Sequence, residues 1–393
     1  MEIKFADRVA TLAPSAIREI MKYSGIPGFI SLALGSPAPD AIPSVEIAKI
    51  SSRILAEHPL EALQYSVTEG YAPLREYLTE YMKNKHNIGR EGDAILITSG
   101  AQQVMDLSTK SLCNPGDVVI CEAPSFIGSL NSFRSYGVKL VGVDIEPDGM
   151  NIEKLEQALK ANKNARFIYT IPNFQNPTGI TMSLEKRKAV YDLAKKYGVM
   201  ILEDNPYGDI RFAGESLPSI KSFDEDGIVI YAGTFSKVLA PGMRVGYGIA
   251  PQKLISKMVV CKQVSDVHTT ILTQMIAYEF MTGCDYEAHL EHIRSIYRKK
   301  SALTDKLLND NLGGLATYHP VQGGLFYWLT LPEGKDMQAF CTKAAENKVA
   351  VVPGTAFVIG DEKCNSFRIN YSAPTDEKLT EAVQILGRVA KEF

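Results

Sequence analysis

The sequence predicts an α/β fold: a large domain built on a mostly parallel sheet with helices on both faces, followed by a smaller α+β domain. Short apolar runs alternate with amphipathic stretches as far as about residue 250, which is typical of such a sheet. The chain has 393 residues, more than one hydrophobic core usually serves, and its pattern changes after residue 251. We therefore expect an N-terminal segment over residues 1–45, a large domain over 46–285 and a small domain over 286–393.

Seven short runs rich in Val, Ile and Tyr are the expected strands of the large domain. Most are followed closely by Gly, Pro, Asn or Ser, which commonly end strands. The runs are Ala94–Thr98, Val118–Glu122, Val138–Asp144, Arg166–Ile171, Val199–Glu203, Ile228–Ala232 and Val245–Ala250. They predict a seven-stranded sheet whose two faces are both buried.

Helical periodicity fills the spaces between these strands. Gln102–Cys113 and Leu184–Tyr197 carry apolar residues at steps of three and four. Beyond residue 251 we expect one long helical region from about Gln252 to Asn309, bent or broken near Gly283. The small domain then has strand candidates and a final helix, at Leu325–Leu331, Val349–Val352, Ser366–Tyr371 and from Asp376 onward.

Composition argues against several classes of protein. The formal net charge of -3 and the absence of a basic stripe argue against nucleic acid as a partner. No apolar run approaches the length of a membrane span, and no signal peptide is evident, so we expect a cytoplasmic protein that binds no membrane. The six cysteines form no CxxC pair. His289 and His292 lack a third ligand, so we expect a solvated helix face there and no metal site.

Polar clusters follow four of the predicted strands. They are Ser99–Gln102, Asn173–Gly179, Asp204–Tyr207 and Thr234–Lys237. Ligands in open α/β sheets bind outside the carboxyl ends of the strands. We therefore expect the four clusters to surround one crevice.

The chemistry of these clusters suggests one ligand. The helix start at Ser99-Gly100-Ala101 suits a phosphate, to which Ser236 and Arg244 could add a hydroxyl and a guanidinium. Asp204 could hold a positive charge, and Lys237 is an amine that can attack a carbonyl. A phosphate, a cationic ring nitrogen and an aldehyde together describe pyridoxal 5′-phosphate (PLP). Each residue alone has a plain structural explanation, such as a surface lysine, a helix cap or a turn. The ordered combination favours the cofactor.

The order of motifs over almost the whole chain resembles the class I/II aminotransferases of PLP fold type I. The matching stretches are Gln64-Tyr65 with Glu69–Arg75, Thr98–Gln103, Gln175–Gly179, Asp204 with Tyr207, Ser236-Lys237 with Pro241-Gly242-Arg244-Gly246, Gly323-Gly324-Phe326-Trp328 and Phe367-Arg368-Ile369. Within the family, the chain is most similar to the 2-aminoadipate/kynurenine aminotransferase branch. The stretches that carry this similarity are Ile17–Ile20, Leu63–Arg75 and Asp266–Thr269.

The resemblance implies roles for individual residues. Lys237 would carry the cofactor and move a proton at the substrate Cα. Asp204 would keep the pyridine nitrogen protonated, while Asn176 and Tyr207 would donate to the cofactor's phenolate oxygen. Tyr207 joins Lys237 and Asp204 in the predicted catalytic group. Phe126, where this branch often has Tyr, would stack on the ring.

The remaining cofactor and substrate contacts are also implied by the family pattern. The phosphate and its surroundings would be contacted by Ser99, Gly100, Ala101, Gln102, Thr234, Ser236 and Arg244, with Tyr65 reaching in from the second subunit of a homodimer. Substrate would be bound by Arg368, Asn176, Gly35 and Arg18. Arg368 would grip the α-carboxylate as a bidentate pair.

Arg18 stands in a predicted short helix, Ser15–Tyr23, over the pocket mouth. It would meet the distal carboxylate of acidic substrates. The alternative, a surface arginine or a partner for Glu19, stays open.

The predicted function is transfer of the amino group of an α-amino acid (2-aminoadipate, aromatic or branched aliphatic) to a keto acid such as 2-oxoglutarate. Two alternatives remain: a PLP-dependent β-lyase on the same scaffold, and a non-catalytic aminotransferase-like binding domain. Some bacterial regulators fuse such a domain to an N-terminal helix-turn-helix domain. The aminotransferase-like region begins here by about residue 15, so we expect no such domain.

Overall fold

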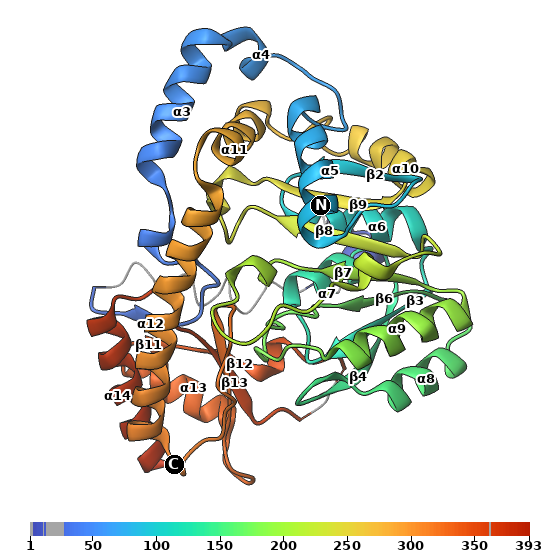
Figure 1. Ribbon diagram of the computed structural model, residues 1–393. Helices are drawn as coiled ribbons and strands as arrows, with labels where there is room; N and C mark the ends of the chain where they lie inside the picture. The colour runs from blue at the N-terminus through green and yellow to red at the C-terminus, as the bar shows by residue number, and fades with distance from the viewer. Residues whose placement is uncertain (1–2, 11, 13–26, 361–362) are drawn as a thin grey trace.

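The computed structural model describes residues 3–10, 12, 27–360 and 363–393 (Figure 1). Its centre is an eight-stranded sheet with the strand order β2-β9-β8-β7-β6-β3-β4-β5. The strands are β2 (Asp93–Thr98), β3 (Val118–Ala123), β4 (Lys139–Glu146), β5 (Gly149–Met150), β6 (Ala165–Thr170), β7 (Met200–Asp204), β8 (Val229–Thr234) and β9 (Gly246–Pro251). All seven strands expected from the sequence are present.

The prediction of seven strands is wrong by one. The eighth strand, β5, pairs antiparallel with β4 through only two residue pairs, so it is too short to show any periodicity in the sequence. The four pairings that join β4, β3, β6, β7 and β8 are parallel, whereas β9 runs antiparallel to both β8 and β2. The carboxyl ends of the parallel strands therefore share one edge of the sheet.

Both faces of the sheet are buried, because successive side chains of each strand point to opposite faces. Val118 and Ile120 of β3 pack in one core cluster, and Val119 and Cys121 in another. The first cluster contains residues of α8 (Ile152–Ala161) and α9 (Leu184–Tyr197), which Figure 1 shows side by side against the sheet. The second contains residues of α6 (Ala101–Leu112) and α7 (Ile127–Arg134). This layering explains the continuous apolar runs.

The single helical region expected after residue 251 is three helices. They are α10 (Gln252–Gln263), α11 (Ile271–Gly283) and α12 (Tyr286–Leu312). The break near Gly283 is confirmed, but the break over residues 264–270 was not expected. Val267 there has a φ of 66°, and Asp266 and Thr269 are bonded to a different part of the chain. Those contacts are tertiary, so helical periodicity does not reveal them.

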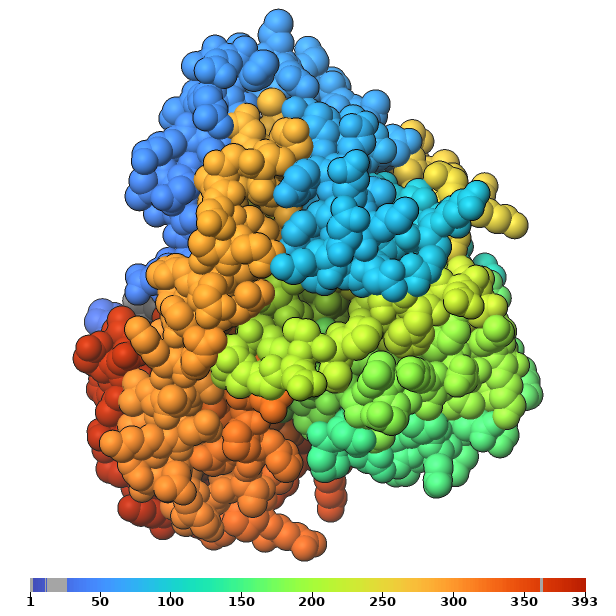
Figure 2. Space-filling view, viewed as in Figure 1, coloured from blue at the N-terminus to red at the C-terminus, as the bar shows by residue number. Residues whose placement is uncertain are grey.

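The smaller domain is built on an antiparallel sheet of β10 (Phe326–Thr330), β13 (Ser366–Asn370) and β12 (Val352–Pro353). The expected strand over Val349–Val352 is divided, since β11 (Val349–Ala350) pairs instead with β1 (Ile30–Ser31). Helices α13 (Met337–Glu346) and α14 (Asp376–Glu392) cover this part. In Figure 2, the orange atoms of α11 and α12 run from the blue helices at the top of the view to the smaller domain at its lower left.

The remaining helices precede the large sheet along the chain. They are α1 (Asp7–Ala10), α3 (Ser44–Glu57), α4 (Pro59–Leu63) and α5 (Ala72–His86). Among the described residues, no helix has the length and apolar character that crossing a membrane requires.

Candidate active site

A cavity of about 890 Å³ lies where the polar clusters leave the sheet. Twelve of the residues predicted from the sequence line it: Gly35, Ala101, Gln102, Phe126, Asn176, Asp204, Tyr207, Thr234, Ser236, Lys237, Arg244 and Arg368. Ser99, Gly100 and Tyr65 are not among its lining residues, and Arg18 falls outside the described part of the chain. The four predicted clusters thus meet in one place, as parallel strand ends should.

Lys237 follows β8 and stands half-buried at the cavity wall. Its Nζ donates to the carbonyl oxygen of Gly35 at 2.7 Å. Burial lowers the pKa of Lys237 to about 8, and the positive charges of Arg368 and Arg244 act in the same direction. A substantial neutral fraction near pH 8 makes this amine a usable nucleophile and base.

Asp204 ends β7 and is 4% exposed. Its Oδ2 accepts a hydrogen bond from the hydroxyl of Tyr169 at 2.8 Å, whereas Oδ1 is buried with no hydrogen-bond partner among the described residues. Burial raises the pKa of Asp204 to about 7, and the bond from Tyr169 opposes that rise. A buried carboxylate oxygen without a donor is costly, so Oδ1 calls for a cationic donor from the cavity.

Close backbone packing shapes the turn between β2 and α6. Gly100 has a φ of 78°, and a Cβ at this position would lie 2.3 Å from Nη2 of Arg244. A Cβ on Gly246 would lie 2.6 Å from the carbonyl carbon of Gly100. Two glycines are therefore needed to bring Arg244 against the start of α6. The guanidinium is anchored there by the Ser99 carbonyl oxygen, which accepts from Nη2 at 3.1 Å.

The start of α6 also decides which backbone N–H groups remain available for an anion. Ser99 donates its N–H to Oε1 of Gln103 at 2.8 Å, and Gly100 donates to the carbonyl oxygen of Thr98 at 2.8 Å. Ala101 and Gln102 occupy the first helical turn, where N–H groups lack intrahelical partners, and both line the cavity. The N–H groups left to bind an anion at this predicted site are therefore those of Ala101 and Gln102, two of the four residues assigned to it from this turn. Ser236 completes it, with its Oγ 3.4 Å from Nη1 of Arg244 and 3.0 Å from Oγ1 of Thr234.

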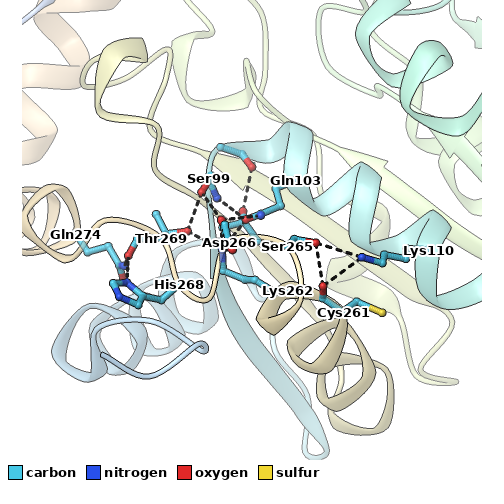
Figure 3. A network of polar contacts seen from close by, with 12 residues as sticks. Ser99, Gln103, Lys110, Cys261, Lys262, Ser265, Asp266, His268, Thr269 and Gln274 are labelled. Atoms are coloured by element: carbon cyan, nitrogen blue, oxygen red, sulfur yellow. Dashed lines mark hydrogen bonds and ion pairs between the residues drawn. The ribbon is translucent and has the colours of Figure 1, made fainter. Parts of the chain in front are cut away.

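The side chain of Ser99 belongs to a polar network beside the cavity (Figure 3). Its Oγ donates to Oδ2 of Asp266 at 3.0 Å and lies 3.1 Å from Oγ1 of Thr269. The ammonium group of Lys262, whose side chain is 0% exposed, lies at the centre of the network. It donates to both carboxylate oxygens of Asp266 at 2.8 Å and to Oε1 of Gln103 at 2.7 Å. The network ties residues 264–270 to the helix start that borders the anion site.

Phe126 immediately precedes α7 and lies along one side of the cavity. Its ring occupies the space that a side chain at Gly128 would need, since a Cβ there would lie 2.6 Å from Cζ of the ring. Gln102 holds this segment from α6 by donating to the carbonyl oxygen of Gly128 at 3.0 Å. The ring is thereby held as a flat apolar wall, which suits stacking on an aromatic ligand.

Arg368 of β13 enters the cavity from the smaller domain and is 1% exposed. Its Nη1 donates to Oδ1 of Asn176 at 2.7 Å and its Nη2 to the carbonyl oxygen of Ala33 at 2.6 Å. Nε has no hydrogen-bond partner among the described residues. The guanidinium carbon lies 4.0 Å from the ring centroid of Phe326. Burial lowers the pKa of Arg368 to about 9, so this cation favours a bound carboxylate.

Asn176 and Tyr207, predicted to contact the same cofactor oxygen, both line the cavity. Burial is the main cause that raises the pKa of Tyr207, with Arg368 opposing and Asp204 adding to the rise. Tyr207 therefore keeps its proton and can donate it in a hydrogen bond. The ring meets Phe326 edge-on at 6.1 Å, which fixes the direction of the hydroxyl.

Tyr65, a predicted cofactor contact, lies outside the cavity. The side chain of Tyr65 is exposed on the single chain, where its ring meets that of His268 edge-on at 6.1 Å.

The expectation that His289 lies on a solvated helix face is wrong. Its Nε2 is 2.7 Å from the carbonyl oxygen of Val238, next to Lys237, and its ring packs on Phe280. Within the described ranges, no group of three potential ligands could hold a metal ion.

Sequence reasoning missed four residues that shape the site. Tyr169 and Ser129 stand behind Asp204, and Phe326 and Phe357 flank the Arg368 guanidinium. Tyr169 lies in a correctly predicted strand, two residues before its expected end, so alternation could have marked it as facing the α6 side. Phe326 stands in a quoted motif without an assigned role.

The residues present fit PLP. An unpaired buried carboxylate oxygen on Asp204 suits a protonated ring nitrogen, and the flat wall at Phe126 suits the ring. The glycine-lined turn with Arg244 and Ser236 suits a phosphate, and Lys237 suits an aldehyde carbon. Fold and site together define a PLP enzyme of fold type I.

Comparisons with known proteins agree. The family model for aminotransferase class I and II matches residues 28–386. The aromatic-amino-acid aminotransferase 1 of Thermococcus litoralis is 38% identical over 99% of this chain and 94% of its own length. The 2-aminoadipate transaminase of Thermus thermophilus is 36% identical over 98% of this chain and 96% of its own. The crystal structure of Pyrococcus horikoshii kynurenine aminotransferase, solved with PMP, superposes with a TM-score of 0.95 at 35% identity, covering 99% of this chain and 97% of that one.

The chain belongs to the class I and II aminotransferases. It is a PLP-dependent enzyme that transfers the amino group of an α-amino acid to a keto acid. The two curated relatives named above support transamination and lend no support to the β-lyase or binding-domain alternatives.

Proposed function

We propose that this transaminase takes 2-aminoadipate, aromatic or branched aliphatic amino acids as donors and 2-oxoglutarate or a similar keto acid as acceptor. We assign Lys237 to cofactor attachment and proton transfer, Asp204 to the ring nitrogen and Arg368 to the substrate α-carboxylate. One observation supports the assignment most directly. The amine of Lys237, the open oxygen of Asp204 and the buried guanidinium of Arg368 line a single cavity.

The mechanism follows from what each side chain can do in that cavity. PLP, when bound, supplies an electron-accepting ring for the substrate Cα. Arg368 binds and orients the α-carboxylate, because its fork matches a carboxylate and Asn176 and Ala33 hold it in place. Lys237, once free, takes the proton from Cα and later returns one, since its lowered pKa leaves much of it neutral. The carbonyl oxygen of Gly35 accepts a hydrogen bond from Nζ of Lys237 and holds the side chain at the cavity wall.

Two observations support the proposed substrate range: the apolar lining of the cavity and the substrates named for the relatives. Its described lining is mostly apolar around Phe126, Ile127, Met105 and Phe326, which suits aromatic and aliphatic side chains. The relatives named for aromatic amino acids, 2-aminoadipate and kynurenine support this range. For acidic substrates we retain Arg18, assigned from the sequence, as the partner of the distal carboxylate.

The test begins with the cofactor and ends with a donor screen. Purified protein supplied with PLP should be yellow, and borohydride reduction followed by peptide mass mapping should place the pyridoxyl group on Lys237. Lys237→Ala should lose the covalent adduct. With 2-oxoglutarate as acceptor, glutamate should form from aminoadipate, aromatic and branched donors. A label on another lysine would refute the assignment, and no glutamate from any of these donors would refute the proposed substrates.

We also propose that the working unit is a homodimer that shares its active sites. Large apolar side chains are exposed on two segments, α4 with the residues after it and residues 264–270. They are Leu60, Leu63, Tyr65, Val67, Val264 and Val267, and the two segments meet where the rings of Tyr65 and His268 are in contact. The exposed fraction of the Tyr65 side chain is 82%, which is unusual for a large ring on a monomer and supports its burial by a second copy.

A further inference from the structure

Asp204 is supported from behind by a side chain outside the cavity. Tyr169 comes from β6, the strand paired with β7, and is 0% exposed. Its hydroxyl donates to Oδ2 of Asp204 at 2.8 Å. Ser129 of α7 lies on the other side of the same hydroxyl, with its Oγ 2.8 Å away. A Tyr hydroxyl has one proton, so when Tyr169 donates it to Asp204, Ser129 becomes the donor to Tyr169.

The support leaves the two oxygens of Asp204 with different tasks. Oδ2 is occupied by Tyr169, and Oδ1 has no partner among the described residues. The Tyr169 ring is itself held edge-on against Phe133, with centroids 5.1 Å apart. The carboxylate plane therefore cannot rotate without breaking a buried hydrogen bond. A ring nitrogen that binds Asp204 meets one oxygen in one orientation.

The hydrogen bond also limits the negative charge available on Asp204. Burial and the negative charges of Asp204 and Glu122 raise the pKa of Tyr169 well above its ordinary value, so it remains a donor throughout the working pH range. The other charged and titratable groups of the site are Lys237, Tyr207, Arg244 and Arg368 at the cavity wall. A donor to a carboxylate makes it a weaker base. With Tyr169 in place, Asp204 would accept a hydrogen bond from the protonated ring nitrogen, and the proton would stay mainly on the nitrogen.

We propose that Tyr169 is a positioning residue for transamination, which aims Oδ1 of Asp204 at the cofactor ring nitrogen and moderates its basicity, with Ser129 reinforcing the effect. The proposal rests on the proposed function of Lys237 and Asp204. It extends that function to a residue that touches neither substrate nor cofactor.

Tyr169→Phe tests the proposal because the ring and its packing on Phe133 stay while the hydroxyl is lost. More negative charge on Asp204 should stabilise the protonated form of the lysine–cofactor linkage. The pH midpoint of the visible absorbance of the PLP-loaded enzyme should therefore rise by ~0.3 unit or more, about a twofold change in proton affinity. The kcat should fall several-fold with little change in KM, since a ring that gives more of its proton to Asp204 accepts electrons less well.

Two further variants make the test decisive. Ser129→Ala should raise the midpoint in the same direction by less, and it carries the test if Tyr169→Phe does not fold. Tyr191→Phe is the matched control, because it also removes a buried Tyr hydroxyl bonded to a carboxylate, 2.6 Å from Asp226, in the other core cluster. Its midpoint should equal that of the wild type.

The outcomes separate this proposal from the proposed function. A wild type that forms no visible band with PLP would refute the assignment of Lys237 itself. A wild type that titrates normally, with Tyr169→Phe at the wild-type midpoint (or Ser129→Ala, where Tyr169→Phe does not fold), would refute only the role of Tyr169.

Discussion

At the scale of single residues, the site depends on buried charged groups that each have one atom without a hydrogen-bond partner. Nε of Arg368 and Oδ1 of Asp204 are both buried and unpaired among the residues that the structure describes. Leaving such groups unsatisfied costs free energy, which a bound carboxylate and a bound ring nitrogen would restore. Pairing these two groups on binding therefore contributes to the affinity for the substrate and the cofactor.

Arg368→Lys should weaken the binding of every amino donor and leave the affinity for PLP unchanged. The ammonium keeps the charge but loses the planar fork and the bond to Asn176. We expect KM for all donors to rise roughly 10-fold or more, the loss of about 1.5–3 kcal/mol of charge-assisted bonding. Steady-state kinetics with an aromatic and an acidic donor measures this. A matching loss of PLP affinity, read by absorbance titration, would instead assign Arg368 to cofactor binding through Asn176.

Arg18→Ala should weaken the binding of acidic substrates more than that of apolar donors. If Arg18 meets the distal carboxylate, KM for 2-aminoadipate and 2-oxoglutarate should rise roughly 10-fold, by the same bond energy of about 1.5–3 kcal/mol. Leucine and aromatic donors should change little in the donor half-reaction, measured by single-turnover absorbance. Similar losses for both classes would show that Arg18 supports the structure and does not read the substrate.

At the scale of elements, the break between α10 and α11 connects the start of α6, which borders the cavity, to the molecular surface. Lys262 on the last turn of α10 holds Asp266 and Gln103 together (Figure 3). Burial raises the pKa of Asp266, but the bonds from Lys262 and Gln103 outweigh it and leave the pKa below its ordinary value. The carboxylate therefore stays charged and keeps residues 264–270 against the start of α6.

Lys262→Met should loosen this connection without emptying the core, because Met fills a similar volume. We expect a lower thermal midpoint and PLP binding weakened roughly 10-fold, since Gln103 and Asp266, which both bond to Ser99, lose the ammonium that they share. Pyridoxal, which lacks the phosphate, should lose much less affinity. Lys253→Met, an exposed change on the same helix, is the control. Equal losses for PLP and pyridoxal would contradict a link to the phosphate.

At the scale of the whole molecule, two buried carboxyls should make the stability of the apoprotein depend on pH. Glu122 is 2% exposed and accepts from Thr170, Ile171 and Gln175. Burial raises its pKa to about 7, with the charge of Asp204 adding to the rise, and the pKa of Asp204 is also raised to about 7. In each case the native state binds more protons than the unfolded state. The stability these groups contribute is complete below about pH 4 and is lost as the pH rises through about 7.

Glu122→Gln should therefore become relatively more stable as the pH rises. The difference in unfolding free energy between the variant and the wild type should grow by ~1–3 kcal/mol from pH 5 to pH 8. Urea unfolding of both apoproteins at several pH values measures this. Glu91→Gln, an exposed change, should show no such trend. A constant difference across the range would mean that Glu122 is ionised in both states.

Mixing two inactive variants should reveal shared sites in the proposed dimer. Lys237→Ala and Tyr65→Ala homodimers should each be impaired. If Tyr65 serves the neighbouring site, one site of each hybrid dimer regains both residues, and up to about half of the site activity in hybrids returns. Exchange is verified with differently tagged subunits. Verified hybrids without recovered activity would argue that each chain completes its own site.

Much of the fold and of the site could be predicted because the signals are local. Seven strands of the large sheet follow from apolar runs of the right length, and most of the predicted residues that line the cavity do so because strand ends bring them to one edge. Lys237 and Asp204 could be assigned from residue type and from their places after predicted strands, whereas Arg368 was assigned from the resemblance to the family.

Tertiary structure decided the rest, because it depends on contacts between distant parts of the chain. The N–H groups of Ser99 and Gly100 are bonded within the protein, so of the four predicted residues only Ala101 and Gln102 keep N–H groups for an anion. The break over residues 264–270 follows from bonds that cross more than 160 residues. The bonds from Tyr169 to Asp204 and from Arg368 to Asn176 join separate strands and domains. Periodicity and motifs determine which residues reach the site, whereas only packing determines which of their donors and acceptors are left free.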